Sequence, residues 1–230
     1  MMSLISAREL TKTYDSGDVP VLALRGADFD IDGGAFVAFV GPSGSGKSTL
    51  LNLVGCLDRP TSGSLSVAGT DVTVLGREER ARFRGDHIGF VFQDFNLVQV
   101  LSAFENVEYP LMILRSWSAK RRRARVEEVL DAVELGELAG KRPGELSGGQ
   151  KQRVAVARAL VTGPKLVLAD EPTANLDRET ALRVIGLMKR MRDEIGTTFV
   201  FSTHDPKVMA AAEIVFTLED GRLRSDGGAA

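Results

Sequence analysis

The stretch that decides the fold is Gly41-Pro42-Ser43-Gly44-Ser45-Gly46-Lys47-Ser48-Thr49, which fits the pattern G-x-x-x-x-G-K-[ST]. Glycines let a backbone turn tightly and approach an anion closely, and the successive amides of such a loop point inward as hydrogen-bond donors. The stretch therefore predicts a loop that binds the phosphates of a nucleotide. Lys47 is expected to reach the β- and γ-phosphates, and the Ser48 hydroxyl is a candidate ligand for Mg²⁺.

The residues on either side of this loop predict a strand before it and a helix after it. Residues 35–40 form a short apolar run, as a buried parallel strand requires. Residues 49–56 read as a buried helix, which should begin near Gly46 and direct its positive end at the phosphates. A Gly/Ser-rich turn between two core elements is the alternative. The order of strand, glycine loop and helix favours the phosphate-binding interpretation.

The composition is that of an ordinary globular protein. The chain has 230 residues, of which 43% are hydrophobic and 26% are charged, and this length suits one large domain. The formal net charge of −2 provides no bulk attraction to nucleic acid, so no nucleic-acid partner is expected. No apolar run approaches the roughly 18–20 residues that span a bilayer.

Cysteine and histidine are scarce, and this bears on the cellular compartment in which the protein is expected. Cys56 is the single cysteine, so an intramolecular disulfide is impossible and a buried thiol in a reducing compartment is expected. One cysteine and two histidines are too few for a structural zinc site. Residues 1–8 lack the apolar core of a signal peptide. These features predict a cytoplasmic location.

The rest of the chain alternates between strand and helix signals. Residues 3–32 contain alternating apolar and polar positions, which indicate half-buried antiparallel strands. The other predicted elements are strands at residues 88–92, 166–170 and 197–201, helices at residues 76–85 and 178–195, and a hairpin around residues 219–221.

Between roughly residues 94 and 162 the pattern is helical. Ser102 forms a capping box with the glutamate three residues on, and Pro110 should end or kink the helix that follows. Ser118 caps a second helix. A third helix starts near Gly149. The layout predicts an α/β nucleotide-binding core that is interrupted by a helical insertion.

Polar side chains follow several of the predicted strands. Asp170 ends an apolar strand, the usual place for a carboxylate that orients Mg²⁺ beside a phosphate loop, and Glu171 follows it. One carboxylate would hold the metal's hydration shell while the other polarises the attacking water; a plain boundary between strand and loop is the alternative. His204 and Gln93 also end strands, where each could contact the γ-phosphate or the metal, but either residue taken alone could be structural.

A second stretch, Leu146-Ser147-Gly148-Gly149-Gln150, has the features of another anion site. It offers a serine hydroxyl, two glycines with exposed amides and the start of a helix. It lies about 100 residues from the phosphate loop, within the helical segment. One chain need not use both sites on one nucleotide. A head-to-tail dimer could place this helix end on the γ-phosphate bound by the partner's loop.

Together these motifs resemble those of the ATPase subunit of an ABC (ATP-binding cassette) transporter, and the resemblance covers essentially residues 1–230 as one ATP-binding domain. It implies a P-loop α/β fold, in which a RecA-like parallel sheet and an antiparallel β-subdomain carry a helical subdomain at approximately residues 94–162. It also implies ATP and Mg²⁺ as ligands. The matching parts in chain order are Tyr14 (A-loop), residues 41–49 (Walker A), Gln93 (Q-loop), residues 146–150 (signature), residues 166–170 (Walker B) with Glu171, residues 174–177 (D-loop) and His204 (switch).

The resemblance also assigns roles to these residues. It implies that Tyr14 stacks on adenine, that Ser48 and Gln93 ligate Mg²⁺, that Glu171 is the general base and that His204 contacts the γ-phosphate. Catalysis would thus depend on Glu171, His204 and Gln93. Ser147, Gly148, Gly149 and Gln150 would bind the nucleotide held by a second copy.

Four short segments are similar to the macrolide-exporter and lipoprotein-release branch of the family (MacB/LolD-like), namely residues 52–63, 92–97, 105–107 and 110–111. This branch implies a homodimer that forms on ATP binding and works with a separate integral membrane permease. The chain would then be peripheral, at the cytoplasmic face of a bacterial-type cell membrane. Ala174 departs from the branch, which commonly has glycine there. A methyl group should be tolerated at this position if φ is negative.

Two surface features leave alternatives open. The apolar side chains after Gln93 could receive a cytoplasmic element of the permease or could pack inside the helical subdomain; they are Phe95, Leu97, Val98, Leu101 and Phe104. The basic run at residues 120–125 reads either as a solvated helix face or as a contact with anionic lipid headgroups.

The expected function is ATP hydrolysis that drives a permease in export, lipoprotein release or mechanotransmission. An alternative output is the regulation of a cell-envelope enzyme through a permease-like partner that transports nothing. A soluble ABC protein acting on ribosomes or DNA would usually carry tandem cassettes or long coiled-coil insertions, and neither is present. A binding module without hydrolysis would need to lack Glu171 or Lys47, and both are present.

Overall fold

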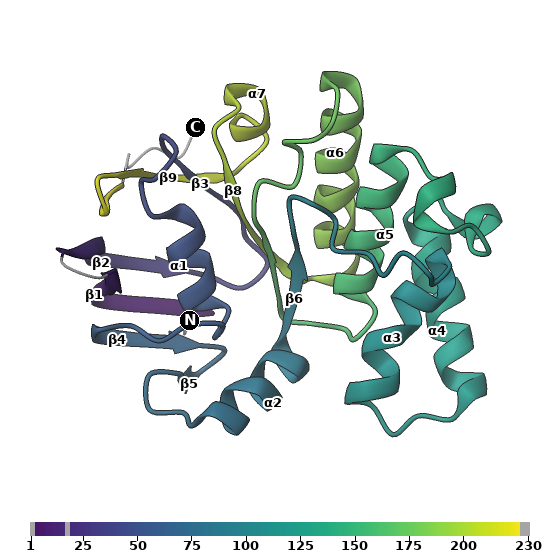
Figure 1. Cartoon of the computed structure of the whole chain (residues 1–230), viewed down its shortest axis with the longest axis horizontal. Helices are drawn as coiled ribbons and strands as arrows, with labels where there is room; N and C mark the ends of the chain where they lie inside the picture. The colour runs from purple at the N-terminus through teal and green to yellow at the C-terminus, as the bar shows by residue number, and fades with distance from the viewer. Residues whose placement is uncertain (1–2, 17–18, 226–230) are drawn as a thin grey trace.

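The computed structural model describes residues 3–16 and 19–225 and contains two sheets (Figure 1). The smaller sheet is antiparallel, with strand order β2-β1-β4-β5. Its strands have one face in the core and one outside, and the alternation of buried and exposed side chains along β2 is the pattern predicted for residues 3–32. Its strands are β1 (Ile5–Ser16), β2 (Val19–Ile31), β4 (Ser62–Val67) and β5 (Thr70–Asp71).

The larger sheet has the strand order β10-β9-β3-β8-β7-β6, and all of its strands except β10 run parallel. All side chains of β3, β7 and β8 are buried, which explains why these strands read as continuous apolar runs. The hairpin predicted near the end of the chain is formed by β9 and β10. The strands are β3 (Phe36–Val40), β6 (Ile88–Val91), β7 (Leu166–Ala169), β8 (Thr198–Thr203), β9 (Ile214–Glu219) and β10 (Arg222–Ser225).

Helix α1 (Lys47–Val54) follows the phosphate loop and lies between the two sheets (Figure 1). It begins after Gly46, as predicted. The expectation that Cys56 belongs to this helix is wrong. The helix ends at Val54 with Gly55 as its C-cap, and Cys56 adopts a left-handed conformation with φ 55°. Cys56 is nevertheless buried and free, as predicted for a core thiol.

Two predicted helix starts in the segment between β6 and β7 are confirmed. Ser102 accepts a hydrogen bond from the Glu105 amide, while the Glu105 carboxylate accepts one from the Ser102 amide. Ser118 caps the next helix. The segment contains α3 (Ala103–Leu114), α4 (Ala119–Ala132), α5 (Gly148–Leu160) and two short 3₁₀ turns at Gly136–Leu138 and Pro143–Glu145.

Pro110 does not end its helix, contrary to one of the two outcomes predicted for it. Helix α3 continues to Leu114. Val107 and Leu111, on either side of the proline, are completely buried in the cluster that includes residues of α4 and α5. This packing outweighs the loss of one helical hydrogen bond at the proline.

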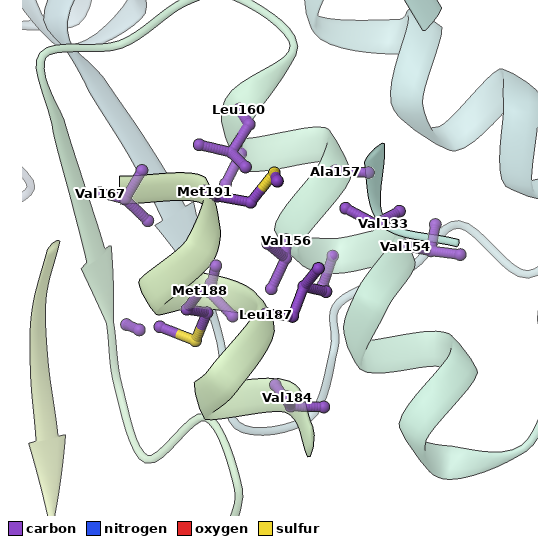
Figure 2. Close-up of a cluster of buried hydrophobic side chains, with 14 of the residues drawn as sticks. Val133, Val154, Val156, Ala157, Leu160, Val167, Val184, Leu187, Met188 and Met191 are labelled. Carbon is purple, nitrogen blue, oxygen red and sulfur yellow. The ribbon is translucent and has the colours of Figure 1, made fainter. Parts of the chain in front are cut away.

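The parallel sheet is covered on both faces. One face packs with α1 and the antiparallel sheet, while the other packs with helices α3 to α6 in a single continuous core. Figure 2 shows side chains of α5 and α6 (Arg178–Ile195) interleaving beside Val167 of β7. The helical segment thus shares its core with the sheet, so its boundaries as a subdomain stay a prediction. Helices α2 (Arg77–His87) and α7 (Pro206–Met209) complete the fold, and among the described residues no helix has the length and apolar character needed to cross a bilayer.

Candidate functional site

Five neighbouring parallel strands end at the same edge of the large sheet, and polar or loop residues follow each of them. β3 leads into the phosphate loop, β8 into His204, β7 into Asp170 and Glu171, and β6 into Gln93 two residues on. The fifth strand, β9, leads into the turn at Asp220 and Gly221. The carboxyl ends of such strands are where open α/β sheets bind ligands.

A cavity of about 730 Å³ opens at this edge. It gathers residues that are far apart in the sequence, including Gln93, Glu171 and His204, around the phosphate loop. From the loop it takes Pro42, Ser43, Gly44, Gly46, Lys47, Ser48 and Thr49. Gly41 and Ser45 do not line it.

The glycines Gly41 and Gly46 are required by positive φ angles and by close backbone contacts. Gly41 has φ 151°, and a Cβ atom there would overlap the carbonyl oxygen of Leu218. Gly46 has φ 106°, and its Cβ atom would lie 2.6 Å from the carbonyl oxygen of Ala23. A side chain at either position would force the loop away from β2 or β9. The glycines of the motif therefore fix the loop against the strands behind it.

Lys47 is held inside the loop. Its Nζ atom donates hydrogen bonds to the carbonyl oxygens of Gly41, at 2.8 Å, and Pro42, at 2.9 Å. The residue is only 8% exposed, and among the described residues no carboxylate forms an ion pair with it. A buried ammonium group whose partners are carbonyl oxygens leaves its positive charge available to an anion in the cavity.

Glu171 and His204 meet across the cavity. The Nδ1 atom of His204 lies 3.1 Å from Oε1 and 3.0 Å from Oε2 of Glu171. The Glu171 side chain is 16% exposed, whereas that of His204 is 68% exposed. Glu171 also has φ 46°, an uncommon conformation for a residue with a side chain. The strand end thus holds this carboxylate in a constrained position at the cavity wall.

Ser202 orients the acidic pair, and sequence reasoning missed it. Its hydroxyl donates a hydrogen bond to Oδ1 of Asp170 at 2.6 Å and accepts one from the Glu171 amide at 2.8 Å. Ser202 is completely buried. The available signal was weak: a serine inside an otherwise apolar strand that neighbours the strand bearing the acids. Asp170 itself does not line the cavity but lies directly before Glu171, which does.

Gln93 lines the cavity, and its main chain is tied to the D-loop. The Nδ2 atom of Asn175 donates to the Gln93 carbonyl oxygen and to Oδ1 of Asp94, both at 3.1 Å. Ala174 lines the cavity beside them and is not among the described residues with positive φ. Ala174 therefore meets the condition under which a methyl group is tolerated there, which is that φ is not positive.

Tyr14 lies next to the cavity rather than on its wall. Its hydroxyl donates to Oδ2 of Asp58 at 3.0 Å, and the Nζ atom of Lys12 lies 4.7 Å from the ring centroid. Burial is the main cause that raises the pKa of Tyr14, and a hydrogen bond with Thr49, which lines the cavity, opposes this rise. The ring is therefore close to the loop, but its stacking on a base stays a prediction.

Ser147, Gly148, Gly149 and Gln150 form the start of α5 and do not line the nucleotide cavity. Ser147 accepts a hydrogen bond from the Gln150 amide, and Oε1 of Gln150 accepts one from the Ser147 amide. Three of the four, all but Gly148, line a separate hollow of about 700 Å³ between α5 and α6. One copy of the chain thus keeps its two predicted anion sites apart.

Gly149 has a packing role that its sequence context did not reveal. It is buried, and a Cβ atom there would overlap the Cγ2 methyl group of Thr180 on α6. A Cβ atom at Gly148 would lie 3.2 Å from Cδ2 of Leu176. The two glycines let the start of α5 approach the D-loop and α6 closely.

Further cavity residues come from β2 and from the turn after β9, neither of which was predicted to contribute. Gly221 accepts a hydrogen bond from the Arg25 amide and donates one to the Ser45 carbonyl oxygen. The turn therefore connects β2 to the phosphate loop. These additional lining residues are Val21, Leu22, Ala23, Arg25, Asp220 and Gly221.

The basic run on α4 is largely paired within the molecule. Arg122 binds Glu108, Arg123 binds Glu127 and Arg125 binds Glu128. The guanidinium carbon of Arg121 lies 3.9 Å from the ring centroid of Trp117. These contacts favour the interpretation of the run as a solvated helix face over the lipid contact.

A phosphate loop at the end of one parallel strand, with acidic residues ending the strand two places away, defines a P-loop nucleotide-binding protein. Residues 24–174 match the ABC transporter family, and the chain belongs to that family. It is an ATP-binding cassette ATPase.

Relatives with the same fold agree with this assignment. The chain is 45% identical over 229 residues, 99% of its length, to the macrolide export ATP-binding/permease protein MacB of Syntrophobacter fumaroxidans. It is 47% identical over 94% of its length to the lipoprotein-releasing system ATP-binding protein LolD of Anaeromyxobacter dehalogenans, and covers 90% of that protein. The match to MacB covers 32% of that longer protein, so the chain spans about a third of it.

A solved structure also matches closely. The dimeric, post-hydrolysis ATP-binding cassette MJ0796 bound to ADP and Pi superposes with a TM-score of 0.88 at 42% identity. The match covers 97% of this chain and 99% of that one. The α/β fold with its parallel sheet is thus that of an ABC cassette.

Proposed function

We propose that two copies of this chain hydrolyse ATP head-to-tail and drive a separate membrane permease from the cytoplasmic face of the cell membrane. The observation that carries the proposal is the single cavity in which Lys47, Gln93, Glu171 and His204 meet at the ends of four strands. Export or lipoprotein release is the favoured output, because the relatives MacB and LolD are named for macrolide export and lipoprotein release.

The side chains in the cavity suit in-line attack of water on the γ-phosphorus. Lys47 and the loop amides hold the phosphates. Glu171 accepts a proton from the attacking water as the new P–O bond forms, and the bond to the ADP oxygen breaks. His204, which touches both Glu171 oxygens, holds that carboxylate in place and reaches the γ-phosphate. Gln93, which follows the neighbouring strand β6, orients the water.

The residues proposed for Mg²⁺ fit that ion chemically. Ser48 and Gln93 line one cavity and offer a hydroxyl and an amide oxygen, and Asp170 adds a carboxylate that Ser202 orients. Mg²⁺ prefers such oxygen ligands and takes its remaining ones from water and phosphates. When bound, the ion would neutralise phosphate charge.

The head-to-tail arrangement is supported by the separation of the two anion sites. Ser147, Gly149 and Gln150 line a hollow other than the nucleotide cavity, and a second copy of the chain would bring them to the γ-phosphate. These residues form the start of helix α5, with Ser147 as its N-cap, and a helix start is a place where an anion is favoured. The solved structure of the cassette MJ0796 is dimeric, which is a precedent for the pairing of two copies.

An exposed apolar surface on the helical segment is the proposed docking site for a cytoplasmic element of the permease. The apolar side chains expected to take part after Gln93 divide: Leu97 is buried, Phe95 and Phe104 pack on the core, Leu101 is half-buried and Val98 is 41% exposed. Large apolar side chains rarely stay exposed together without a partner. The surface comprises Val98, Val100, Tyr109, Met112, Ile113 and Leu114, each at least 39% exposed.

The test is phosphate release from ATP by the purified chain, with Glu171→Gln and with Met112→Asp as variants. Glu171→Gln should stop turnover while ATP still binds. Met112→Asp should leave the basal ATPase rate unchanged but abolish stimulation by a permease reconstituted with the chain. Undiminished hydrolysis by Glu171→Gln would remove this residue from its role, and normal stimulation of Met112→Asp would contradict the docking surface.

A further inference from the structure

The segment that follows Gln93 has an unusual backbone. Phe95 has φ 61° and Asn96 has φ 47°, although neither is a glycine. Two consecutive residues in the left-handed region carry a conformational cost unless the surroundings hold them there. Their two carbonyl oxygens turn toward the same side chain, that of Arg158.

Arg158 holds both of these carbonyl oxygens. Its Nη2 atom donates to Phe95 O at 2.8 Å, and its Nη1 atom donates to Asn96 O at 2.5 Å. Burial lowers the pKa of Arg158, and among the described residues no carboxylate forms an ion pair with it. Burying a guanidinium group that has only carbonyl partners costs free energy, so the position of the Arg158 side chain depends on the segment that it binds.

Arg158 belongs to the helix that begins with the signature motif. Helix α5 runs from Gly148 to Leu160 with Ser147 as its cap. At 1.5 Å per residue, Arg158 lies about 16 Å along the helix from Ser147. The helix is tightly packed between them: Val154, Val156 and Ala157 are 0% exposed, and Figure 2 shows Val156 beside side chains of α6. It will therefore move as a rigid element.

The opposite side of the segment is tied to the nucleotide cavity. Gln93 lines that cavity, and Asn175 of the D-loop donates to Gln93 O and to Asp94. Residues 93–96 are thus held by the cavity at one end and by α5 at the other. A Cβ atom at Gly89 of β6 would also overlap the carbonyl oxygen of Ala159, so the strand that precedes the segment touches α5 beside Arg158.

We propose that Arg158 is a positioning residue that joins residues 93–96 to helix α5. Through this connection, a nucleotide bound in one chain's cavity determines the position of Ser147, which in the dimer contacts the nucleotide of the second copy. This rests on the head-to-tail dimer proposed above. Arg158 touches neither nucleotide. It makes the two sites of the dimer dependent on each other, which appears as cooperativity in ATP concentration.

Arg125 is a matched control in the same structure. Its Nε atom donates to Val161 O at 3.1 Å and its Nη2 atom to Leu160 O at 3.3 Å, at the end of the same helix. It also pairs with Glu128. Arg125 thus donates to two main-chain carbonyl oxygens, as Arg158 does, but its acceptors lie at the end of α5 and it has no hydrogen bond to residues 93–96.

The experiment compares Arg158→Met, Arg158→Lys and Arg125→Met in the full chain. ATP affinity is titrated under conditions where the chain is monomeric, and the ATPase rate is measured against ATP concentration. Arg158→Met should keep the ATP affinity within about twofold, lower kcat at least tenfold and bring the Hill coefficient from near 2, its limit for two sites, toward 1. Arg158→Lys should be intermediate, and Arg125→Met should keep the wild-type Hill coefficient.

A wild-type Hill coefficient in Arg158→Met, or an equal loss in Arg125→Met, overturns the proposal. If Arg158→Met does not fold, Arg158→Lys with a wild-type melting temperature decides, since an unchanged Hill coefficient there overturns it as well. Failure of the proposed dimer itself is distinct, because the wild-type chain would then remain monomeric with ATP and show a Hill coefficient of 1. That result removes both proposals.

Discussion

The Nδ1 atom of His204 lies 3.0 Å from Oε2 of Glu171, at the carboxyl ends of the adjacent strands β8 and β7. The carboxylate is mostly buried and the imidazole is mostly exposed. The contact therefore joins a fixed group at the cavity wall to one that is open to a ligand. We propose on this basis that His204 holds the carboxylate in place and contacts the phosphate.

Replacing His204 by alanine should impair hydrolysis more than binding. We expect kcat to fall roughly 10²-fold, in the range for loss of an aligned acid–base group, with little change in ATP affinity. Steady-state phosphate release and a nucleotide titration measure the two quantities. His87, the other histidine, lies before β6, at the opposite edge of the sheet from the cavity, and His87→Ala is the control. Equal rates for wild type and His204→Ala would contradict the assigned role.

Lys47→Ala should lose nucleotide binding. The variant removes a buried positive charge from the phosphate loop and leaves the carbonyl oxygens of Gly41 and Pro42 without this donor. We expect the dissociation constant for ATP to rise by roughly 100-fold or more, since a charged hydrogen-bonded contact contributes about 3 kcal/mol. Calorimetric titration checks this. Wild-type ATP affinity in a folded Lys47→Ala chain would exclude the assignment of the loop.

Ser202→Ala should lower both the free energy of unfolding and the rate of ATP hydrolysis. The buried hydroxyl bonds Asp170 and the Glu171 amide, so its removal should lower the free energy of unfolding by about 1–3 kcal/mol. Because it also orients the acidic pair, kcat should fall. Thr198→Val at the other end of β8 is the control, since it removes the acceptor for the Gly34 amide far from the cavity. The role of Ser202 would be purely structural if both variants kept the same kcat.

Gly149→Ala should destabilise the chain by about 1–3 kcal/mol, because the new methyl group would overlap Cγ2 of Thr180. Thr180→Ser removes that methyl group while keeping the hydroxyl. The double variant should therefore recover most of the lost stability in urea unfolding. If the double variant loses as much stability as the two single variants together, the contact between the helices is not the cause.

Cys56 should be unreactive in the folded chain. Burial raises the pKa of its thiol from 9.0 to about 11. The unfolded chain loses this proton first, so the contribution of Cys56 to stability is complete below about pH 9 and is lost as the pH rises through about 11. At pH 8 a thiol reagent should label the native chain far more slowly than the chain in urea. Equal labelling rates would contradict the burial.

Much of the fold could be predicted because its signals are local. The capping box at Ser102, the phosphate loop and the apolar strands are each defined by a few adjacent residues. The helix limits were harder. Helix α3 passes Pro110 because Val107 and Leu111 are buried by partners distant in sequence, and tertiary packing of this kind overrides local preference.

The site was predicted where a residue type is diagnostic at a strand end, as for Glu171 and His204. Ser202 and Arg158 were missed because their roles come from contacts across about 31 and 62 residues of sequence. The packing of Gly149 on Thr180 was missed for the same reason. A motif shows which residues meet a ligand, whereas the residues that hold them in place are defined only by the folded structure.

The central claim is that the phosphate loop is half of a site whose other half belongs to a second copy. The most direct test is the mass of the Glu171→Gln chain, measured by light scattering with and without saturating Mg²⁺ and ATP. The account predicts the mass of one 24.8 kDa chain without ATP, about twice that mass with ATP, and one chain again when Ser147→Arg is added. A single-chain mass at saturating ATP, or an ATP-dependent dimer that survives Ser147→Arg, would contradict it.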